Sequence, residues 1–293
     1  MQTVVILICT FNRPRYLDEL LTALTHEVSS APCKTLSIVV VDNGTQDVSN
    51  LAEAFRSVLP MEYVRLPQSG LVGARNCSLR RGLRHNPDFL VFIDDDEVPE
   101  SGWLRELLST LTTSGADFAV GPVNPKFSQV PPTWAIKFFT KTGESFCTSN
   151  LIIRASVVPR DEAEWFQTRF SLTGGEDGDF LRRLAASGAR YAVAHSALVL
   201  ENIPADRVTA RYVWRSGFRD GVVAAQLSSS RTGEGANVAR NIWLALRKAA
   251  YGLNHLLWSI LKPGRIYRAI DDFAMASGVL LGSFGFTCKF YGS

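Results

Sequence analysis

Short apolar runs alternate with segments of helical spacing through the first hundred residues, and this order limits the folds open to the chain. The apolar runs lie at residues 4–9, 36–41, 63–66 and 89–93. The helical segments, with apolar residues three or four positions apart, lie at residues 14–24, 51–59, 72–83 and 103–111. Because most of these runs are apolar at consecutive rather than at alternate positions, we predict buried strands of a parallel sheet with helices on both faces.

Beyond these residues the alternation becomes irregular. We expect strands at residues 117–120 and 147–153, on either side of a proline-rich stretch, and a helix at residues 176–186. After Pro204 the chain is predicted to be wholly helical to near the C-terminus. We therefore divide the chain into an α/β domain at residues 1–203 and a helical region at residues 204–293.

The charge is distributed unevenly between these two parts. Residues 1–203 hold 19 basic and 23 acidic residues, a net charge of −4, whereas residues 204–293 hold 12 and 5, a net charge of +7. The formal charge of the whole chain, +3, is too small to indicate a nucleic-acid-binding protein. A hydrophobic content of 46% excludes a disordered chain.

The cysteine content bears on the compartment. The five cysteines are widely spaced, never form a C-x-x-C pair, and are Cys9, Cys33, Cys77, Cys147 and Cys288. Neither a zinc site nor a disulfide framework is expected from them, and the expected compartment is reducing. The N-terminus runs straight into an apolar strand and shows no secretory signal. We find no stretch of about 18–20 uncharged apolar residues that would predict a membrane span.

Polar clusters follow three of the predicted strands. Thr-Phe-Asn-Arg occupies residues 10–13, Asp-Asn-Gly-Thr residues 42–45, and Asp-Asp-Asp-Glu residues 94–97. Because parallel strands end at the same edge of a sheet, we expect all three clusters to lie at one edge. Ligands of open parallel sheets bind at this edge, outside the carboxyl ends of the strands. This convergence predicts a binding site there.

Four consecutive carboxylates cannot all ionise close together without a cation. A hard divalent ion such as Mg²⁺ or Mn²⁺, held by one or two carboxylates and substrate phosphate, would resolve the repulsion. The alternative is a solvated acidic turn that caps the following helix. Asp42 is likewise either a turn-forming residue or an acceptor of hydrogen bonds from a base or ribose.

Glycine-rich phosphate loops are missing from the sequence. Neither G-x-x-x-x-G-K-[ST] nor a G-x-G-x-x-G after the first strand occurs, which disfavours P-loop NTPases and Rossmann dinucleotide-binding enzymes. If a nucleotide binds, its diphosphate is expected to be neutralised by metal and by Arg13 or Arg75.

Two acids, Glu176 and Asp177, begin the helix predicted after Gly174-Gly175. Acidic residues in a first helical turn are stabilised by the helix dipole, which is a purely structural explanation. The adjacent glycines indicate a close backbone approach, and a carboxylate at this place would also serve to deprotonate a hydroxyl nucleophile.

Five motifs now occur in a fixed order, and together they resemble a known family. They are Cys-Thr-Phe-Asn-Arg-Pro at 9–14, Val-Asp-Asn-Gly-Thr at 41–45, Gly-Leu-Val-Gly-Ala-Arg-Asn at 70–76, Phe-Ile-Asp-Asp-Asp-Glu at 92–97 and Gly-Glu-Asp-Gly-Asp at 175–179. Over roughly residues 3–200 the chain resembles the family 2 inverting glycosyltransferases of GT-A fold, above all bacterial enzymes of exopolysaccharide or O-antigen assembly. The resemblance implies a Rossmann-like, mostly parallel α/β sheet flanked by helices, with a C-terminal helical appendage.

The resemblance also implies roles for individual residues. Asp96 takes the place of the principal metal ligand, with Asp94 on the nucleotide sugar and the same metal. Asp177 takes the place of the catalytic base, with Glu176 supporting it or binding the acceptor. The implied donor-binding residues are Thr10, Asn12, Arg13, Asp42, Asn43, Arg75, Asp94 and Asp95. Asn150 falls in the segment that lies below the acceptor site.

One position departs from the family pattern. Many relatives place a histidine some twenty residues after the base, and here Glu201 stands at that position, while His195 is out of register. The sequence leaves two interpretations open: Glu201 is a third carboxylate ligand of the metal, or the metal is held more loosely.

The C-terminal region combines basic and aromatic residues. Arg207, Arg211, Arg215 and Arg219 recur every four residues. Residues 242–261 and 273–286 are apolar but interrupted by polar side chains or too short for a span. This pattern favours an interfacial membrane helix, and a helical cap or a dimer interface is the alternative.

The resemblance implies a peripheral enzyme on the cytoplasmic face of the inner membrane. It would use Mn²⁺ or Mg²⁺, a nucleotide sugar, most simply a UDP-sugar, and a polyprenyl-diphosphate-linked acceptor, with inversion in a single displacement. Two alternatives are a nucleotidyltransferase, for which Thr-Phe-Asn-Arg-Pro is a poor glycine-rich loop, and a catalytically silent nucleotide-sugar-binding subunit of a membrane assembly.

Overall fold

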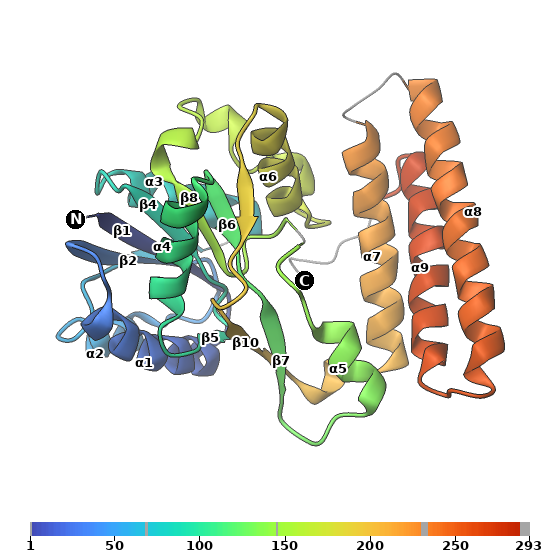
Figure 1. Ribbon diagram of the computed structural model, residues 1–293, viewed down its shortest axis with the longest axis horizontal. Coiled ribbons are helices and arrows are strands. Elements are labelled where there is room, and N and C mark those ends of the chain that lie inside the picture. Colours follow the sequence, from blue (N-terminus) through green and yellow to red (C-terminus); the bar gives the residue numbers. More distant parts are fainter. Residues whose placement is uncertain (1, 68–69, 145, 230–233, 288–293) are drawn as a thin grey trace. The chain divides into compact units, whose positions relative to one another are not determined.

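The computed structural model describes residues 2–67, 70–144, 146–229 and 234–287 (Figure 1). Cys288 lies outside these residues. The chain divides into two compact units, which are described separately. The first unit consists of Met1–Lys126, Thr140–Ser171 and Glu176–Asn202, and the second of Phe127–Phe139, Leu172–Gly175 and Ile203–Ser293.

The strands follow the predicted order through the first hundred residues. They are β1 (Thr3–Thr10), β2 (Thr35–Asp42), β3 (Met61–Arg65), β4 (Phe89–Phe92), β5 (Glu97–Pro99), β6 (Phe118–Val120), β7 (Val123–Phe127), β8 (Leu151–Arg154), β9 (Tyr191–Val193) and β10 (Val199–Ile203). The two strands predicted between residues 117 and 153 are present as β6 and β8. The sequence pattern did not predict β5, β7, β9 and β10, because they are short and because polar residues or proline interrupt all of them except β9.

The predicted helical segments are all present. The helices are α1 (Pro14–Ser30), α2 (Ser49–Phe55), α3 (Gly70–Leu83), α4 (Trp103–Ser114), α5 (Thr133–Phe139), α6 (Glu176–Ala186), α7 (Ala210–Ser229), α8 (Glu234–Ser259) and α9 (Arg265–Ser283). The sequence pattern did not predict α5, and α2 ends four residues before the end of the segment predicted for it. Short 3₁₀ helices occupy Ala155–Val157, Glu162–Glu164, Thr168–Phe170 and Ala205–Arg207. Pro14 stands at the first position of α1, where its missing N–H has no intrahelical partner to lose.

The main sheet has seven strands in the order β3-β2-β1-β4-β8-β6-β9. β1 pairs in parallel with both β2 and β4, and β2 pairs in parallel with β3. β8 runs antiparallel to both its neighbours. A second, three-stranded sheet has the order β5-β10-β7. The mostly parallel, helix-flanked α/β architecture is therefore confirmed.

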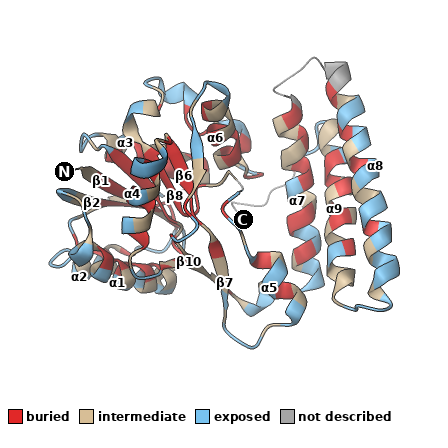
Figure 2. Ribbon diagram, in the orientation of Figure 1, coloured by how far each residue is buried: buried red, intermediate tan, exposed pale blue. Residues whose placement is uncertain are grey.

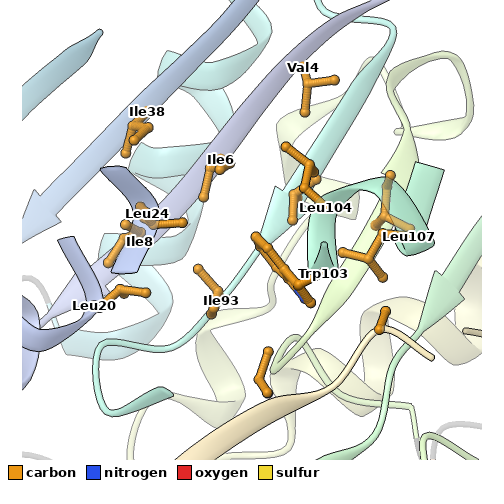
Figure 3. Close-up of a cluster of buried hydrophobic side chains, with 14 of the residues drawn as sticks. Val4, Ile6, Ile8, Leu20, Leu24, Ile38, Ile93, Trp103, Leu104 and Leu107 are labelled. Atoms are coloured by element: carbon orange, nitrogen blue, oxygen red, sulfur yellow. The ribbon is translucent and has the colours of Figure 1, made fainter. Parts of the chain in front are cut away.

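Alternate residues of the central strands enter two different cores. Ile6 and Ile8 of β1 face a core built with Leu20, Leu24 and the helix that starts at Trp103 (Figure 3). The intervening residues of the same strand face a second core, built with α3 and α6. Burial on both faces explains why the strands are apolar throughout their length.

A buried carboxylate on α1 defines the start of α4. Glu27 is almost fully buried, and its two oxygens accept hydrogen bonds from the backbone N–H groups of Gly102 (2.8 Å) and Leu104 (3.1 Å). These N–H groups have no partner within the helix, so the carboxylate satisfies them and lies at the positive end of the helix dipole. The loop that precedes α4 is fixed by the same contact.

The second unit contains a helical bundle of α7, α8 and α9. α7 and α9 approach so closely that a Cβ atom on Gly278 would lie 2.1 Å from the carbonyl oxygen of Phe218. A Cβ atom on Gly221 would lie 2.2 Å from the carbonyl oxygen of Met275. No helix within the described part of the chain combines the length and the apolar character that a membrane crossing needs.

We predict that Gly278→Ala destabilises the helical unit. Helix propensity alone would make this change stabilising by about 1 kcal/mol, but the added methyl group has no room against the backbone of α7 and forces the helices apart, at a cost of roughly 1–3 kcal/mol. Chemical denaturation followed by circular dichroism measures the net effect. Leu281→Ala, at an exposed position of the same helix, is the control and should change little. A Gly278→Ala protein more stable than the wild type would contradict the close packing.

Candidate active site

Three predicted clusters meet at the carboxyl edge of the main sheet because β1, β2 and β4 are parallel neighbours. The hydroxyl of Thr10 donates a hydrogen bond to Asp95 Oδ2 over 2.8 Å. Arg13 Nη1 donates to Asp95 Oδ1 (3.0 Å) and to Asp96 Oδ2 (2.9 Å). The segment after the first strand thus neutralises part of the negative charge of the acidic segment that follows the fourth strand.

Asn12 joins the first cluster to the second. Its Oδ1 accepts hydrogen bonds from the backbone N–H groups of Thr45 (2.8 Å) and Gln46 (2.9 Å), and its own backbone has a positive φ of 54°. Asn43 is buried, and its N–H donates to the carbonyl oxygen of Thr10. The side chain of Asn12 and the backbone of Asn43 therefore order the two loops.

Asp42 is completely buried at the end of β2. Its Oδ1 accepts from the N–H of Gly44 (2.9 Å), and its Oδ2 accepts from the hydroxyl of Tyr63 and the guanidinium of Arg65 (2.8 Å each). Burial and the bond to Asp42 raise the pKa of Tyr63. The sequence did not single out Tyr63 or Arg65, which lie on the next strand. The turn-forming role of Asp42 is visible, and a role in base recognition stays a prediction.

Burial dominates the electrostatics of the acidic loop. It raises the pKa of Asp95 to about 7, against the opposing effect of Arg13 and with a contribution from Asp96. It also raises the pKa of Asp94 and, more strongly, that of Glu97. The loop therefore holds protons at its carboxyl groups or requires additional positive charge.

The donor atoms of this loop suit an open metal site better than a closed one. Nowhere in the described part of the chain do three or more His, Cys, Asp or Glu side chains come together to hold a metal ion. The side chain of Asp94 is 42% exposed, and Asp96 is buried beside Arg13. Glu97 Oε1 is buried and has no hydrogen-bond partner among the described residues. Mg²⁺ and Mn²⁺ accept such a set, because they commonly use one or two carboxylates with water and phosphate oxygens. Glu201 Oε2 is bound by Lys141 Nζ at 2.9 Å.

Arg75 of α3 connects the acidic loop to the start of α6. Its Nη1 forms an ion pair with Glu176 Oε1, and its Nη2 lies 3.5 Å from Asp94 Oδ1. Both Arg75 and Glu176 are buried. Burial raises the pKa of Glu176 to about 7, opposed by Arg75 and increased by Asp177. Glu176 Oε2 has no hydrogen-bond partner in the described residues, which leaves one carboxylate oxygen available for a ligand or a proton.

Asp177 differs from Glu176 in its surroundings. It is only partly buried, its Oδ1 accepts from the N–H of Gly178 (2.7 Å), and its Oδ2 is 3.4 Å from the N–H of Thr148. Gly174 and Gly175 precede the helix with φ values of 78° and 91°, which glycine adopts without strain. Asp177 thus lacks the arginine partner that holds Glu176, and its carboxylate is the more accessible of the two.

Asn150 connects neighbouring segments through its buried side chain. It is completely buried, accepts from Trp103 Nε1 (2.7 Å) and donates to the carbonyl oxygens of Pro122 (2.9 Å) and Ala197 (2.6 Å). One amide therefore ties together three segments that are distant in sequence. The side chain has no exposed surface with which to contact an acceptor.

We predict that Glu176 makes the folded state less stable as the pH rises. Its pKa is about 7 in the folded protein and near 4.5 in the unfolded chain, so between these values the folded state binds more protons and the free energy of unfolding falls with increasing pH. Asp95 acts in the same direction. Glu176→Gln removes one titrating group and should reduce the fall between pH 5 and pH 8 by roughly 1–3 kcal/mol.

Denaturant titrations in the presence of EDTA at the two pH values test this prediction. The control is Glu162→Gln, because Glu162 is exposed and its hydrogen bonds to Arg80 lower its pKa, so this change should not reduce the fall. An equal pH dependence in the wild type and Glu176→Gln would show that Glu176 is ionised in the folded state throughout this range.

Comparisons with known proteins agree with this geometry. The profile of glycosyl transferase family 2 matches residues 5–165. The succinoglycan biosynthesis protein ExoM of Rhizobium meliloti is 29% identical over 95% of this chain and 92% of its own length. A chondroitin synthase of Pasteurella multocida is 24% identical over 68% of this chain, which corresponds to 24% of the synthase.

Solved structures show the same fold at low sequence identity. TarS of S. aureus in complex with UDP-GlcNAc superposes with a TM-score of 0.56 and 16% identity, covering 94% of this chain and 90% of the other. Mannosyltransferase PcManGT of Pyrobaculum calidifontis, in complex with GDP-Man and Mn²⁺, gives 0.59 and 18%, covering 95% and 86%. Because the family profile spans more than half of the sequence, the chain belongs to glycosyl transferase family 2, and the solved structures show that it has the GT-A fold.

Proposed function

We propose that this protein is a metal-dependent, inverting glycosyltransferase that transfers a sugar from a nucleotide-sugar donor to a lipid-linked oligosaccharide in bacterial surface polysaccharide synthesis. The observation that carries the proposal is the bridge made by Arg75. One buried guanidinium contacts Asp94 of the acidic loop and Glu176 at the start of α6. It therefore holds the carboxylates assigned to the donor within reach of those assigned to the acceptor.

The donor side needs positive charge at the diphosphate. Asp94 and Asp96 would hold Mn²⁺ or Mg²⁺, which would supply Lewis-acid stabilisation of the leaving nucleoside diphosphate. Arg13 and Arg75 already neutralise these carboxylates and would add charge near the phosphates. Glu201 as a third ligand stays a prediction, since it would have to exchange its contact with Lys141 for one with the metal.

The acceptor side needs a base with access to a hydroxyl group. Asp177 removes the proton of the acceptor hydroxyl group. The oxygen of that hydroxyl group attacks the anomeric carbon at the same time, from the face opposite the leaving group. This single displacement inverts the anomeric centre. Glu176, held by Arg75, supports Asp177 or binds a second acceptor hydroxyl. Holding both substrates in line supplies a large part of the rate enhancement.

The comparisons bear on the substrates. TarS binds UDP-GlcNAc, and PcManGT binds GDP-Man. We propose that the donor of this protein is a UDP-sugar, and the assay below also tests GDP-sugars. The buried loops at Asp42 and Asn43, together with Thr10, Asn12 and Asp95, would form the nucleotide pocket. ExoM is named as a succinoglycan biosynthesis protein, which supports a role of this chain in exopolysaccharide assembly. A polyprenyl-diphosphate-linked acceptor is our proposal for that role.

An unusual apolar surface supports membrane association on the cytoplasmic face of the inner membrane. Much of α8 is exposed (Figure 2). Large apolar residues are among the exposed positions of α8 and of the following turn: Ile242, Trp243, Leu246, Tyr251, Leu253, Leu257, Trp258, Ile260 and Leu261. Residues 235–270 contain six basic residues and no acidic one. Arg247 lies 4.8 Å from the ring of Trp243, and Arg265 lies 5.7 Å from that of Trp258. Aromatic, apolar and basic side chains in this combination suit an anionic lipid surface.

We predict that Asp177→Asn abolishes sugar transfer and leaves donor binding nearly unchanged, because the amide cannot accept the acceptor proton. Purified protein in mild detergent with Mn²⁺ is given UDP- and GDP-sugars, with and without membrane lipid extract, and nucleoside diphosphate release is measured. Asp18→Asn, an exposed substitution on α1, is the control and should keep full activity. Loss of donor binding together with transfer would indicate that Asp177 is structural.

The same assay separates the alternative functions. Donor binding by the wild type without release under any condition would favour a silent nucleotide-sugar-binding subunit. Pyrophosphate formation from a nucleoside triphosphate and a sugar phosphate would indicate a nucleotidyltransferase. If no nucleotide sugar binds at all, the donor assignment is wrong.

We predict that the double variant Leu253→Glu/Leu257→Glu releases the protein from anionic membranes. Two carboxylates in the exposed face of α8 oppose burial in the lipid interface and repel anionic headgroups, so affinity should fall by about tenfold or more. Co-sedimentation with vesicles of phosphatidylcholine, with and without phosphatidylglycerol, measures the binding. Val58→Glu, at an exposed position of the first unit, is the control. If the wild-type protein does not co-sediment with these vesicles but forms a dimer, the result would support the dimer-interface alternative.

A further inference from the structure

Lys141 occupies a fixed position beside the acidic loop. Its backbone forms an isolated antiparallel bridge with Val123, with reciprocal N–H···O hydrogen bonds of 2.9 Å. Its ammonium group lies 2.9 Å from Glu201 Oε2 on β10. Both the main chain and the side chain are therefore anchored, although the sequence pattern around residue 141 showed no regular element.

A chain of contacts leads from Lys141 to Asp94. Glu201 is paired directly with Glu97 across the antiparallel strands β10 and β5. Glu97 Oε2 in turn accepts the backbone N–H of Asp94 over 3.1 Å. Two carboxylates opposite one another on adjacent strands repel, so a cation at this point stabilises the pair. Lys141 supplies that cation at one end of the acidic loop, whereas Arg13 and Arg75 supply theirs elsewhere.

The exposure of these groups distinguishes Lys141 from a simple counter-ion. The side chain of Glu201 is 13% exposed and Glu97 is buried, whereas the side chain of Lys141 is 40% exposed, much like that of Asp94. An ammonium group has three N–H donors, and Glu201 is the hydrogen-bond acceptor found for it among the described residues. The buried acids thus hold a cation whose outer side reaches solvent.

The charge on Lys141 is permanent at neutral pH. Burial opposes the charged form, but Glu201 and then Glu97 outweigh this effect and hold the pKa of Lys141 above its ordinary value. Its contact with Glu201, the pairing of Glu201 with Glu97 and the bond from Glu97 to the backbone of Asp94 place Lys141 at the same acidic loop as the carboxylate to which we assign donor contacts.

We propose that Lys141 binds the diphosphate of the nucleotide sugar and that Glu201 is its positioning residue. The proposal rests on the proposed function. As the bond between the anomeric carbon and the terminal phosphate oxygen breaks, its electron pair stays on that oxygen, and Lys141 stabilises the new charge without giving up its proton. The acceptor oxygen forms the new bond to the anomeric carbon, and its proton passes to Asp177. Glu201 acts through Lys141 and touches neither substrate.

The decisive experiment measures nucleotide affinity rather than activity alone. Isothermal titration calorimetry with UDP, GDP, UMP and GMP, with and without Mn²⁺, compares the full chain with Lys141→Met, Lys141→Arg and Glu201→Gln. We expect Lys141→Met to weaken diphosphate binding at least tenfold in the presence and absence of Mn²⁺, while monophosphate binding changes less than threefold. Lys141→Arg should recover most of the affinity, and Glu201→Gln should give an intermediate loss confined to the diphosphate.

Controls and kinetics complete the test. Lys126→Met, which removes an exposed lysine 3.7 Å from Glu19, should leave every affinity unchanged. With saturating donor, Lys141→Met should lower kcat for transfer, because stabilisation of the leaving group is lost in the transition state. Circular dichroism verifies that each variant is folded, and Lys141→Arg keeps a positive charge if the methionine variant does not fold.

The possible failures are distinguishable. Unchanged diphosphate affinity in Lys141→Met overturns the role of Lys141 and leaves the proposed function intact. A loss of Mn²⁺ affinity in Glu201→Gln, measured by electron paramagnetic resonance, with normal behaviour of Lys141→Met, would make Glu201 a metal ligand instead. Absence of nucleotide binding by the wild type in all titrations would overturn this proposal and the proposed function together.

Discussion

Burial of several carboxylates at one edge of a sheet is the constraint on which this site depends. Asp42, Asp95, Asp96, Glu97 and Glu176 are all buried, and an ionised carboxylate without a partner is costly in such a place. Cations drawn from other elements neutralise most of them: Arg65 binds Asp42, Arg13 binds Asp95 and Asp96, and Arg75 binds Glu176. Among the residues that the structure describes, one buried oxygen of Glu97 has no hydrogen-bond partner. The folded chain alone therefore leaves part of this charge to be balanced by protons on the carboxyl groups or by a cation that binds.

Much of the fold and part of the site followed from local sequence. Continuous apolar runs identified the parallel strands, and the polar residues after them predicted which loops would meet at the carboxyl edge. The helix at residues 176–186 was placed correctly because its acids and its apolar spacing mark its first turn. The local sequence pattern does not show which residues far apart in the sequence form ion pairs. Arg75 and Glu176 are 101 residues apart, and Lys141 and Glu201 are 60 apart, so their partnership depends on how strands are ordered in two sheets.

The limits of the two units show a similar effect. Composition placed a boundary near residue 203, where basic helices begin. The second unit nevertheless includes Phe127–Phe139 and Leu172–Gly175, which precede that point in sequence. An aromatic contact explains one of these inclusions, because Trp134 stacks on Tyr267 of α9 with ring centroids 3.8 Å apart. A single aromatic residue creates no periodic pattern, so the sequence of the proline-rich stretch does not predict that Trp134 contacts Tyr267.

The contact of Glu27 with α4 has a consequence for the order of assembly. A helix of 12 residues is marginal by itself in water, and two of the N–H groups at the start of α4 find their acceptor on α1. α4 therefore gains these two hydrogen bonds only through its contact with α1. During synthesis the first helix leaves the ribosome some seventy residues before the segment that it completes. The N-terminal strand and helix thus act as a template for the next layer of the domain, and errors in their docking would be carried forward to the acidic loop that lies just before α4.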